Sequence, residues 1–304
     1  MMTTTSHPLA LTDAEKEIFD EQGFLVLRGR IPELLLARCR TAAQTWIDAA
    51  ETAPADHPRA VDWHRAERGG RSRLFRVDYV HDKGGEAALE LLGSPEILGV
   101  AESLAGPDFV PTYESLVFKG ADDGAPVPWH QDAVHPRRHR IFNVGVYLDD
   151  SRSGEGALRV LPGSQRQAAD ICAIEQDAGW EPDGYVEVEL SAGDVLVHDT
   201  MLVHGSPAVR GNHLRRTIYL EFRPAQQIIE EGPWDRTWID ARMRLVPLAL
   251  SSHDAALAHS HPFSWNPSPE LRPSPAPGRE AELRIAHSVH TPGSYCSAGP
   301  PAAG

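Results

Sequence analysis

The stretch Asn143–Leu148, NVGVYL, indicates the fold class of this chain of 304 residues. Its valines and its leucine alternate with Asn143, Gly145 and Tyr147. An alternation with period two is typical of a half-buried β-strand, because successive side chains of a strand point to opposite faces of the sheet. The segment Val186–Leu190, VEVEL, repeats the pattern with glutamates at its polar positions. Both segments are therefore predicted to be strands.

Strand patterns of this kind dominate the region from Pro111 to Arg223. Turn sequences separate the strands at Gly154–Gly156, Leu161–Ser164 and Ala192–Asp194. Short strands that are joined by irregular connections favour an antiparallel sandwich or barrel over a parallel sheet. We therefore expect a double-layered or closed antiparallel sheet at the centre of the chain.

Helical patterns precede this region. Thr12 and Glu15 have the spacing of a capping box, which predicts the start of a helix, and the apolar run Phe24–Leu27 suits a buried strand. After Pro32, apolar residues that include Leu34 recur at helical spacing. The predicted helices span residues 13–22, 32–51, 86–92 and 95–104.

We expect one principal domain, at residues 11–262. Residues 1–10 have no apolar period and are predicted to form a flexible arm. Residues 263–304 are rich in proline and serine, so they cannot bury enough apolar surface to offset the entropy of ordering. This tail is predicted to be largely mobile. The alternative is a tail that folds over an active site, for which Trp265 and Ile285 offer apolar anchors.

The formal net charge of −14 argues against nucleic acid and membrane surfaces as partners and favours a small-molecule substrate. The three cysteines, Cys39, Cys172 and Cys296, show no paired spacing, so neither a disulfide framework nor a cysteine zinc site is expected. The chain begins without a basic and apolar leader, and it contains no run of 18 apolar residues. We expect a soluble, cytoplasmic protein. Its oligomeric state is not indicated.

Two histidines and a carboxylate lie close together in Pro128–His135, PWHQDAVH. On a strand, His130 and Asp132 share a face and can bind one ion. A second imidazole from a neighbouring strand would complete a two-histidine, one-carboxylate triad, which suits non-haem iron(II). His204 is the best candidate, because it follows an apolar strand pattern. His198 is the chief rival, although a hydrogen-bonded core histidine is the favoured interpretation for it.

Downstream of His204, Arg215 and Thr217 share one face of a predicted strand. A guanidinium next to a hydroxyl suits the binding of a carboxylate. The neighbouring Arg216 points to the opposite face and is the rival for that role. The basic run His135–Arg140 is either a solvated loop or a mouth that attracts an anionic substrate.

The ordered set HQD at 130–132, HGS at 204–206 and RRT at 215–217 resembles the phytanoyl-CoA dioxygenase family of iron(II)- and 2-oxoglutarate-dependent oxygenases. The opening sequence LTDAEKEIFDEQGFLVLRG, at 11–29, resembles the start of that family. The resemblance extends from about residue 11 to residue 223. It implies a mainly β fold with flanking helices, in which a double-stranded β-helix, the cupin-like jelly roll, occupies about residues 108–223.

The resemblance also implies roles for single residues. His130, Asp132 and His204 would be the catalytic iron ligands, and Arg215 would bind the distal carboxylate of 2-oxoglutarate. Further contacts to this cosubstrate are implied for four residues: Thr217, Ser206, Lys119 and Tyr113. Gly145 stands where some members carry tryptophan, which would enlarge the substrate space or indicate a shifted alignment.

The activity that the resemblance implies is a dioxygenase reaction, in which O2 and 2-oxoglutarate are consumed and succinate and CO2 are released. Related halogenases have a small residue in place of the carboxylate ligand, so Asp132 favours hydroxylation. The substrate would be a small organic molecule such as a secondary metabolite, an amino acid or an acyl thioester. Two alternatives stay open: a non-catalytic metal-binding jelly roll, and a zinc-dependent hydrolase on a similar barrel.

Overall fold

The computed structural model describes residues 9–68, 71–120, 126–209, 214–257, 261–274 and 290–296. The predicted N-terminal arm lies outside these ranges except for residues 9 and 10, and so does most of the predicted C-terminal tail, at 275–289 and 297–304. The described helices are α1 (Asp13–Gln22), α2 (Glu33–Thr52), α3 (Ala87–Leu92), α4 (Pro95–Ala105), α5 (Ile171–Ala178), α6 (Ala225–Glu231), α7 (Arg236–Met243) and α8 (Leu245–Ala256).

Short 3-10 turns, η1 (Ala60–Asp62), η2 (Val80–Asp82) and η3 (Ser164–Arg166), join some of the elements. The described strands are β1 (Phe24–Leu27), β2 (Trp63–Arg68), β3 (Arg71–Asp78), β4 (Phe109–Lys119), β5 (Val127–Gln131), β6 (Phe142–Tyr147), β7 (Leu158–Val160), β8 (Val186–Val188), β9 (Val195–Asp199), β10 (His204–Ser206), β11 (Arg215–Pro224) and β12 (Ser294–Tyr295).

Two sheets carry the fold. The larger has the strand order β1-β9-β6-β11-β4-β3-β2, and the smaller has the order β12-β5-β10-β7-β8. Every strand pair is antiparallel. The two antiparallel sheets with flanking helices form a jelly roll, which confirms the predicted fold class.

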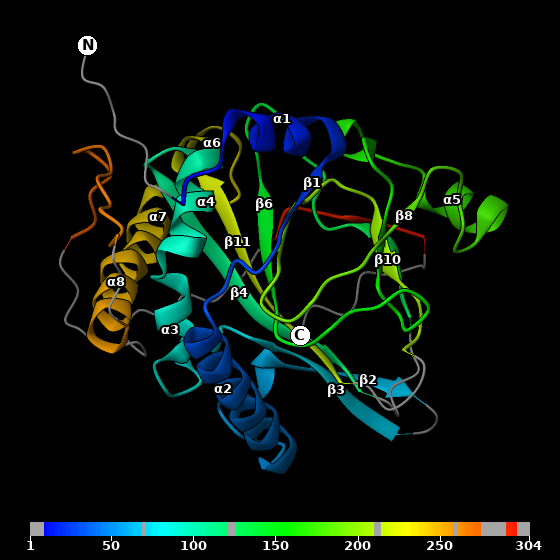
Figure 1. Cartoon of the computed structure of the whole chain (residues 1–304), viewed down its shortest axis with the longest axis horizontal. Helices are drawn as coiled ribbons and strands as arrows, with labels where there is room; N and C mark the ends of the chain where they lie inside the picture. Colours follow the sequence, from blue (N-terminus) through cyan, green and yellow to red (C-terminus); the bar gives the residue numbers. More distant parts are fainter. Residues whose placement is uncertain are drawn as a thin grey trace.

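Helices α2, α3, α4 and α8 lie on the same side of the larger sheet in Figure 1, whereas α5 lies beside the smaller sheet. On β11, the buried Ile218, Leu220 and Phe222 alternate with residues of the opposite face, and they pack into one apolar cluster with the helices. Because this face is filled by apolar side chains, the residues that alternate with them, including Arg215 and Thr217, point to the space between the two sheets. That inner face positions the functional residues described below.

Local sequence signals account for the first elements. Glu15 N–H donates to Thr12 Oγ1 at 3.2 Å, and Thr12 N–H donates to Glu15 Oε2 at 2.7 Å, so the predicted capping box is present. Gly23 ends α1 with a φ of 80°, a left-handed conformation that glycine adopts without steric cost. One detail of α2 was predicted wrongly: Leu34 is 63% exposed, because the buried stripe begins at Leu35.

A disulfide joins Cys172 of α5 to Cys296 beside β12. The expectation that the cysteines are unpaired is therefore wrong for these two, although Cys39 is free and buried. The pairing escaped prediction because the two residues lie 124 positions apart and meet only through tertiary packing. Among the described residues, no helix is both long and apolar enough to span a bilayer.

Candidate metal centre and cosubstrate site

Two neighbouring strands of the smaller sheet supply the candidate metal ligands. His130 lies on β5, Asp132 follows the end of that strand, and His204 opens β10. β5 and β10 are antiparallel with His204 directly opposite His130, and the two imidazole centroids are 4.1 Å apart. The two histidine motifs, which are far apart in the sequence, therefore meet at one directly opposed pair of residues, His130 and His204.

One ligand atom from each of His130, Asp132 and His204 lies within 4.8 Å of the other two. Asp132 Oδ1 is 3.3 Å from His130 Nε2, and Asp132 Oδ2 is 3.8 Å from His204 Nε2. Each histidine directs its Nδ1 to a backbone carbonyl, that of Pro128 at 2.8 Å or Leu202 at 2.9 Å. With Nδ1 as the donor, each Nε2 keeps a lone pair for a metal ion.

Electrostatics favour the metal-binding forms of two of these groups. Burial acts to raise the pKa of the Asp132 carboxyl, but His204 and His130 beside it hold this pKa well below its ordinary value. Burial, with the charge of His130, lowers the pKa of His204 to about 3. Burial also acts to lower the pKa of His130, yet the hydrogen bond with Asp132 raises it overall. A bound cation would replace that proton.

Asn143 on β6 orients the carboxylate, and the sequence motifs did not identify it. Its Nδ2 donates to Asp132 Oδ2 at 2.9 Å. The signal that was available is the NVGVYL alternation, which puts Asn143 on the polar face of its strand. His198, the rival ligand, is 1% exposed, and its Nε2 lies 3.2 Å from Asn143 Nδ2 and 3.5 Å from Asp132 Oδ2. It borders the triad from the other sheet.

The predicted cosubstrate residues meet on the inner face of the larger sheet. Arg215 of β11 is directly opposite Lys119 of β4. Lys119 Nζ donates to Ser206 Oγ at 2.6 Å, and Arg215 Nη2 donates to the same oxygen at 3.3 Å. Arg215 Nη1 donates to the Gly156 carbonyl. Two cations therefore converge on one hydroxyl, and both contacts of Arg215 are to uncharged acceptors.

Thr217 lies on the same face as Arg215, two residues further along β11, and is 3% exposed. Arg216 faces the opposite way. Its Nε and Nη2 are each 2.9 Å from one oxygen of the Asp149 carboxylate, so a bidentate pair holds it away from the inner face. The geometry thus brings together Arg215, Thr217, Ser206 and Lys119 and leaves Arg216 out.

Two other predicted features have a clear position. Tyr113 of β4 is on the inner face as well, where its hydroxyl donates to Asp78. Gly145 does not enlarge the inner space: a Cβ atom there would lie 2.8 Å from the ring of Tyr219, so that ring fills the volume. The suggestion of extra substrate space at Gly145 is therefore wrong.

The basic run His135–Arg140 is largely neutralised. Three of its side chains pair with carboxylates: Arg137 with Asp199 at 2.7 Å, His139 with Glu230 at 2.9 Å, and Arg140 with Asp20 at 2.7 Å. These pairs favour the interpretation of a solvated loop over that of an anion-attracting mouth.

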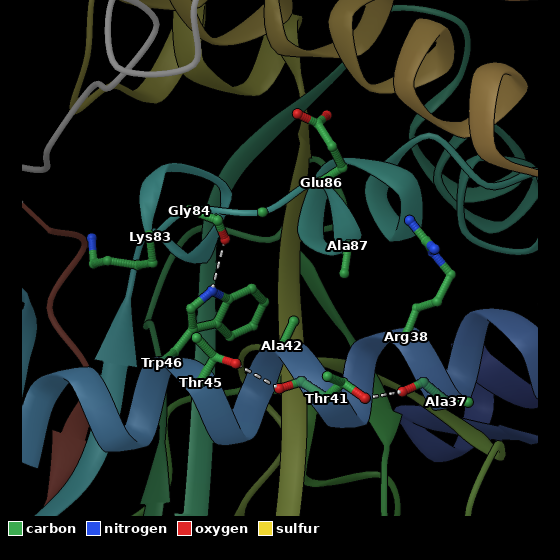
Figure 2. A pocket seen from close by; sticks show the side chains of 11 residues that line it. Ala37, Arg38, Thr41, Ala42, Thr45, Trp46, Lys83, Gly84, Glu86 and Ala87 are labelled. Carbon is green, nitrogen blue, oxygen red and sulfur yellow. Dashed lines mark hydrogen bonds between the residues drawn. The ribbon is translucent and has the colours of Figure 1, made fainter.

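A hollow of about 650 Å³ lies elsewhere, between α2 and the loop that leads into α3 (Figure 2). Both cations on its wall are paired, Arg38 Nε with Glu90 at 2.6 Å and Lys83 with Asp62 at 2.7 Å. The residues that line it include none of the metal triad or of the predicted cosubstrate contacts. It therefore has no part in the site.

Comparison with known proteins identifies the family. The phytanoyl-CoA dioxygenase (PhyH) family profile matches residues 19–217, well over half of the chain. This chain belongs to the phytanoyl-CoA dioxygenase family. The matched segment includes the candidate metal triad and the predicted cosubstrate residues Lys119, Ser206, Arg215 and Thr217.

Several relatives of this family member are similar over part of its length. L-proline trans-4-hydroxylase of Streptomyces griseoviridis is 30% identical over 152 residues, 43% of this chain and 55% of that protein. A probable alpha-ketoglutarate-dependent hypophosphite dioxygenase of Stutzerimonas stutzeri is 27% identical over 155 residues, 46% of this chain and 54% of that protein. The chain thus spans about half the length of these two curated relatives.

One solved structure is similar over a larger share of this chain than these two relatives are. AviO1 from Streptomyces viridochromogenes Tue57 superposes with a TM-score of 0.59 and 30% identity, covering 73% of this chain and 96% of that protein. This likeness supports the fold, whereas the family assignment rests on the profile match to residues 19–217.

Iron and 2-oxoglutarate are the cofactor and cosubstrate of the phytanoyl-CoA dioxygenase family, and the residues of this member fit both. Two imidazoles that direct Nε2 toward the same point and one carboxylate form the donor set of a facial triad for non-haem iron(II). The Arg215 guanidinium, with hydroxyls beside it, is suited to a dicarboxylic acid.

Proposed function

We propose that this family member is an iron(II)- and 2-oxoglutarate-dependent dioxygenase that hydroxylates a small organic molecule. The convergence of His130, Asp132 and His204 within 4.8 Å carries the proposal, because this donor set leaves coordination positions open for a cosubstrate and for O2. The convergence of Arg215 and Lys119 on Ser206 supports it, since a structural metal site has no use for a carboxylate clamp.

In this proposal, His130, Asp132 and His204 hold the iron, and Arg215 binds the distal carboxylate of 2-oxoglutarate. Bound iron supplies the oxidative chemistry, in which 2-oxoglutarate, O2 and a C–H group become succinate, CO2 and an alcohol. Asn143 keeps the Asp132 carboxylate in one orientation through its 2.9 Å hydrogen bond. The Pro128 and Leu202 carbonyls keep both histidines in the tautomer that presents Nε2.

Thr217, Ser206, Lys119 and Tyr113 are assigned supporting roles. Ser206 is held between Lys119 and Arg215, so its hydroxyl and both cations are oriented before any ligand arrives. Preorganised donors of this kind lower the cost of fixing a flexible dicarboxylate. The Tyr113 hydroxyl donates a hydrogen bond to Asp78, so Tyr113 would shape the site rather than contact the cosubstrate.

The substrate is proposed only by class. The two curated relatives are named for L-proline and for hypophosphite, which are small and chemically unlike each other. They support a small molecule without choosing among amino acids, secondary metabolites and acyl thioesters. The proposal also includes a cytoplasmic location, which cell fractionation tests, and a single oxygenase domain at residues 11–262, which limited proteolysis tests.

Anaerobic titration tests the proposal directly. Iron(II) with 2-oxoglutarate should give a weak visible charge-transfer band in the wild-type protein, and His130→Ala should abolish it. Succinate formation should then require O2 and iron(II). A folded protein without the band would contradict the proposal. If the band forms but no substrate of a broad panel gives succinate, the protein is a non-catalytic metal-binding relative. Activity that requires zinc and not O2 would favour a hydrolase.

A further inference from the structure

The C-terminal segment 290–296 lies against the metal centre. In Figure 1 it is drawn in red, and its strand β12 is the neighbour of β5 in the smaller sheet. β12 adds to the edge of the smaller sheet, with Ser294 opposite Gln131 and Tyr295 opposite His130. Because residues directly opposite in an antiparallel pair share a face, Tyr295 is on the metal-binding side of the sheet.

Several contacts hold this segment in place. Val134 N–H donates to the Pro292 carbonyl at 2.7 Å, and Arg223 Nη1 donates to Thr291 Oγ1 at 3.0 Å. The disulfide to Cys172 closes the far end. Gly293 passes so close to β5 that a Cβ atom there would lie 2.5 Å from the Gln131 carbonyl oxygen. The segment is therefore built to fit against the ligand-bearing strand.

Tyr295 contacts the candidate ligand His130 and is also partly exposed to solvent. Its ring stacks on the His130 imidazole with centroids 5.4 Å apart and planes within 11°. The residue is nevertheless 38% exposed, and the Asp132 side chain is 30% exposed, whereas those of His130 and His204 are 10% and 9% exposed. The centre is thus accessible beside Asp132, and Tyr295 lines that opening.

Arg76 faces the same space from the other sheet. It is opposite Val117 of β4, which is in turn opposite Thr217 of β11, so the three residues form a row on the inner face. The Arg76 side chain is 31% exposed. Its Nε is 3.0 Å from Asp78 Oδ1 but is not aligned for a hydrogen bond.

Asp78 positions this guanidinium. Its carboxylate is held by the Tyr113 hydroxyl and by His64 Nε2 at 2.6 Å, so it is a fixed partner. Burial acts to lower the pKa of Arg76, but its electrostatic interactions, with Tyr113 and Asp78 first and with Tyr295 and Asp132 after them, raise it overall. This electrostatic effect agrees with the register in putting Arg76 close to the metal side of the pocket.

We propose that Arg76 and Tyr295 form the substrate subsite of the metal centre, in which Arg76 binds a carboxylate of the substrate and the Tyr295 ring packs against its carbon skeleton. The substrate class is then a small organic acid. This inference rests on the proposed oxygenase function. It differs from the cosubstrate clamp, because Arg215 contacts Ser206 and Gly156 at another part of the inner face.

Three probes separate the two contributions: benzoate, benzamide and acetate. Benzoate has the carboxylate and the ring, benzamide lacks the charge, and acetate lacks the ring. Their dissociation constants are measured by anaerobic calorimetry on the full-length protein loaded with iron(II) and saturating 2-oxoglutarate. The variants are Arg76→Gln, Arg76→Lys, Tyr295→Ala and Tyr295→Phe, and the matched control is Arg71→Gln, an exposed arginine at the start of the same strand.

We expect the wild-type protein to bind benzoate at least about tenfold more tightly than benzamide, since a charge-assisted contact is lost in the amide. Arg76→Gln should remove this preference, and Arg76→Lys should keep part of it. Tyr295→Ala should weaken benzoate severalfold without changing acetate, and Tyr295→Phe should behave like the wild type. Arg71→Gln should have no effect.

Three results would overturn the subsite. They are a loaded wild-type protein that does not bind benzoate, a benzoate preference that survives Arg76→Gln, and an Arg71→Gln variant that is equally impaired. A Tyr295→Ala variant that weakens acetate as much as benzoate would refute the role of the ring. Failure of the proposed oxygenase function is distinguishable, because it appears earlier, as the absence of the iron and 2-oxoglutarate band in the wild-type protein.

Discussion

Replacing Arg215 by alanine should weaken 2-oxoglutarate binding about a hundredfold. The guanidinium stands on the inner face, with Nη2 at 3.3 Å from Ser206 Oγ and with no carboxylate among its described contacts. A bidentate contact to a carboxylate adds two charge-assisted hydrogen bonds of about 1.5 kcal/mol each, or about 3 kcal/mol in total. At 1.4 kcal/mol per factor of ten, this loss raises the dissociation constant by about two orders of magnitude.

The neighbouring Arg216 provides a matched control, because it has the same chemistry on the opposite face. Its guanidinium is bound to Asp149 by two contacts of 2.9 Å. Arg216→Ala should therefore leave 2-oxoglutarate affinity within about twofold and lower the free energy of unfolding by about 1 kcal/mol. The assay is anaerobic titration of each iron(II)-loaded variant with 2-oxoglutarate, followed by the visible band.

The reasoning fails if Arg216→Ala impairs 2-oxoglutarate binding and Arg215→Ala does not. It also fails if both variants lose the same affinity, because the inner and outer faces of β11 would then not be distinguished. Lys119 stays beside Ser206 in either variant, so some affinity should remain. A lysine at position 215 should restore only part of the loss, since an ammonium cannot bind a carboxylate in the bidentate manner.

Three further outcomes are expected. His204→Ala should lower iron(II) content at least tenfold in metal analysis, whereas His198→Ala should lower it only severalfold; equal losses would make His198 a ligand. Reduction of the Cys172–Cys296 disulfide should add two free thiols to the count in denatured protein. It should also lower the free energy of unfolding by about 2–4 kcal/mol. An unchanged thiol count would show that the bond is absent. Burial alone would raise the pKa of Glu114, but its buried partners Arg242 and His81 lower it to about 2. The stabilisation is therefore complete above the ordinary pKa of 4.5 and is lost as the pH falls toward 2. In Glu114→Gln, the free energy of unfolding should fall less steeply between pH 4.5 and pH 2 than in the wild-type protein. An unchanged fall would show that other carboxyl groups cause the acid sensitivity.

Much of the fold was predictable because local spacing reports which residues share a face. The capping box at Thr12 and the stop at Gly23 delimit α1, and the NVGVYL alternation marks β6. Leu34 shows the limit of such patterns: an apolar residue next to a buried stripe is exposed when the helix turns it outward. Which face of α2 packs on the sheet is decided by the partner surface, and the helix sequence alone does not contain that surface.

In the candidate site, too, some features follow from local spacing and others only from the fold. Period-two spacing alone puts His130 and Asp132 on one face and separates Arg215 from Arg216. The meeting of His130 with His204, however, depends on β5 and β10 becoming neighbours, and the hydrogen bond from Asn143 to Asp132 depends on the two sheets facing each other. Such distances are set by the closure of the jelly roll.

The sequence by itself determined the types of the candidate ligands, their order along the chain and the family to which the chain belongs. Only the tertiary structure decided that Tyr295 stacks on the candidate ligand His130, that Arg76 lies on the inner face of the larger sheet and that Cys172 pairs with Cys296. The physical reason is that these contacts join segments with no shared local period. Their geometry follows from which strand occupies the free edge of β5, and strand neighbours are chosen by the packing of the whole sheet.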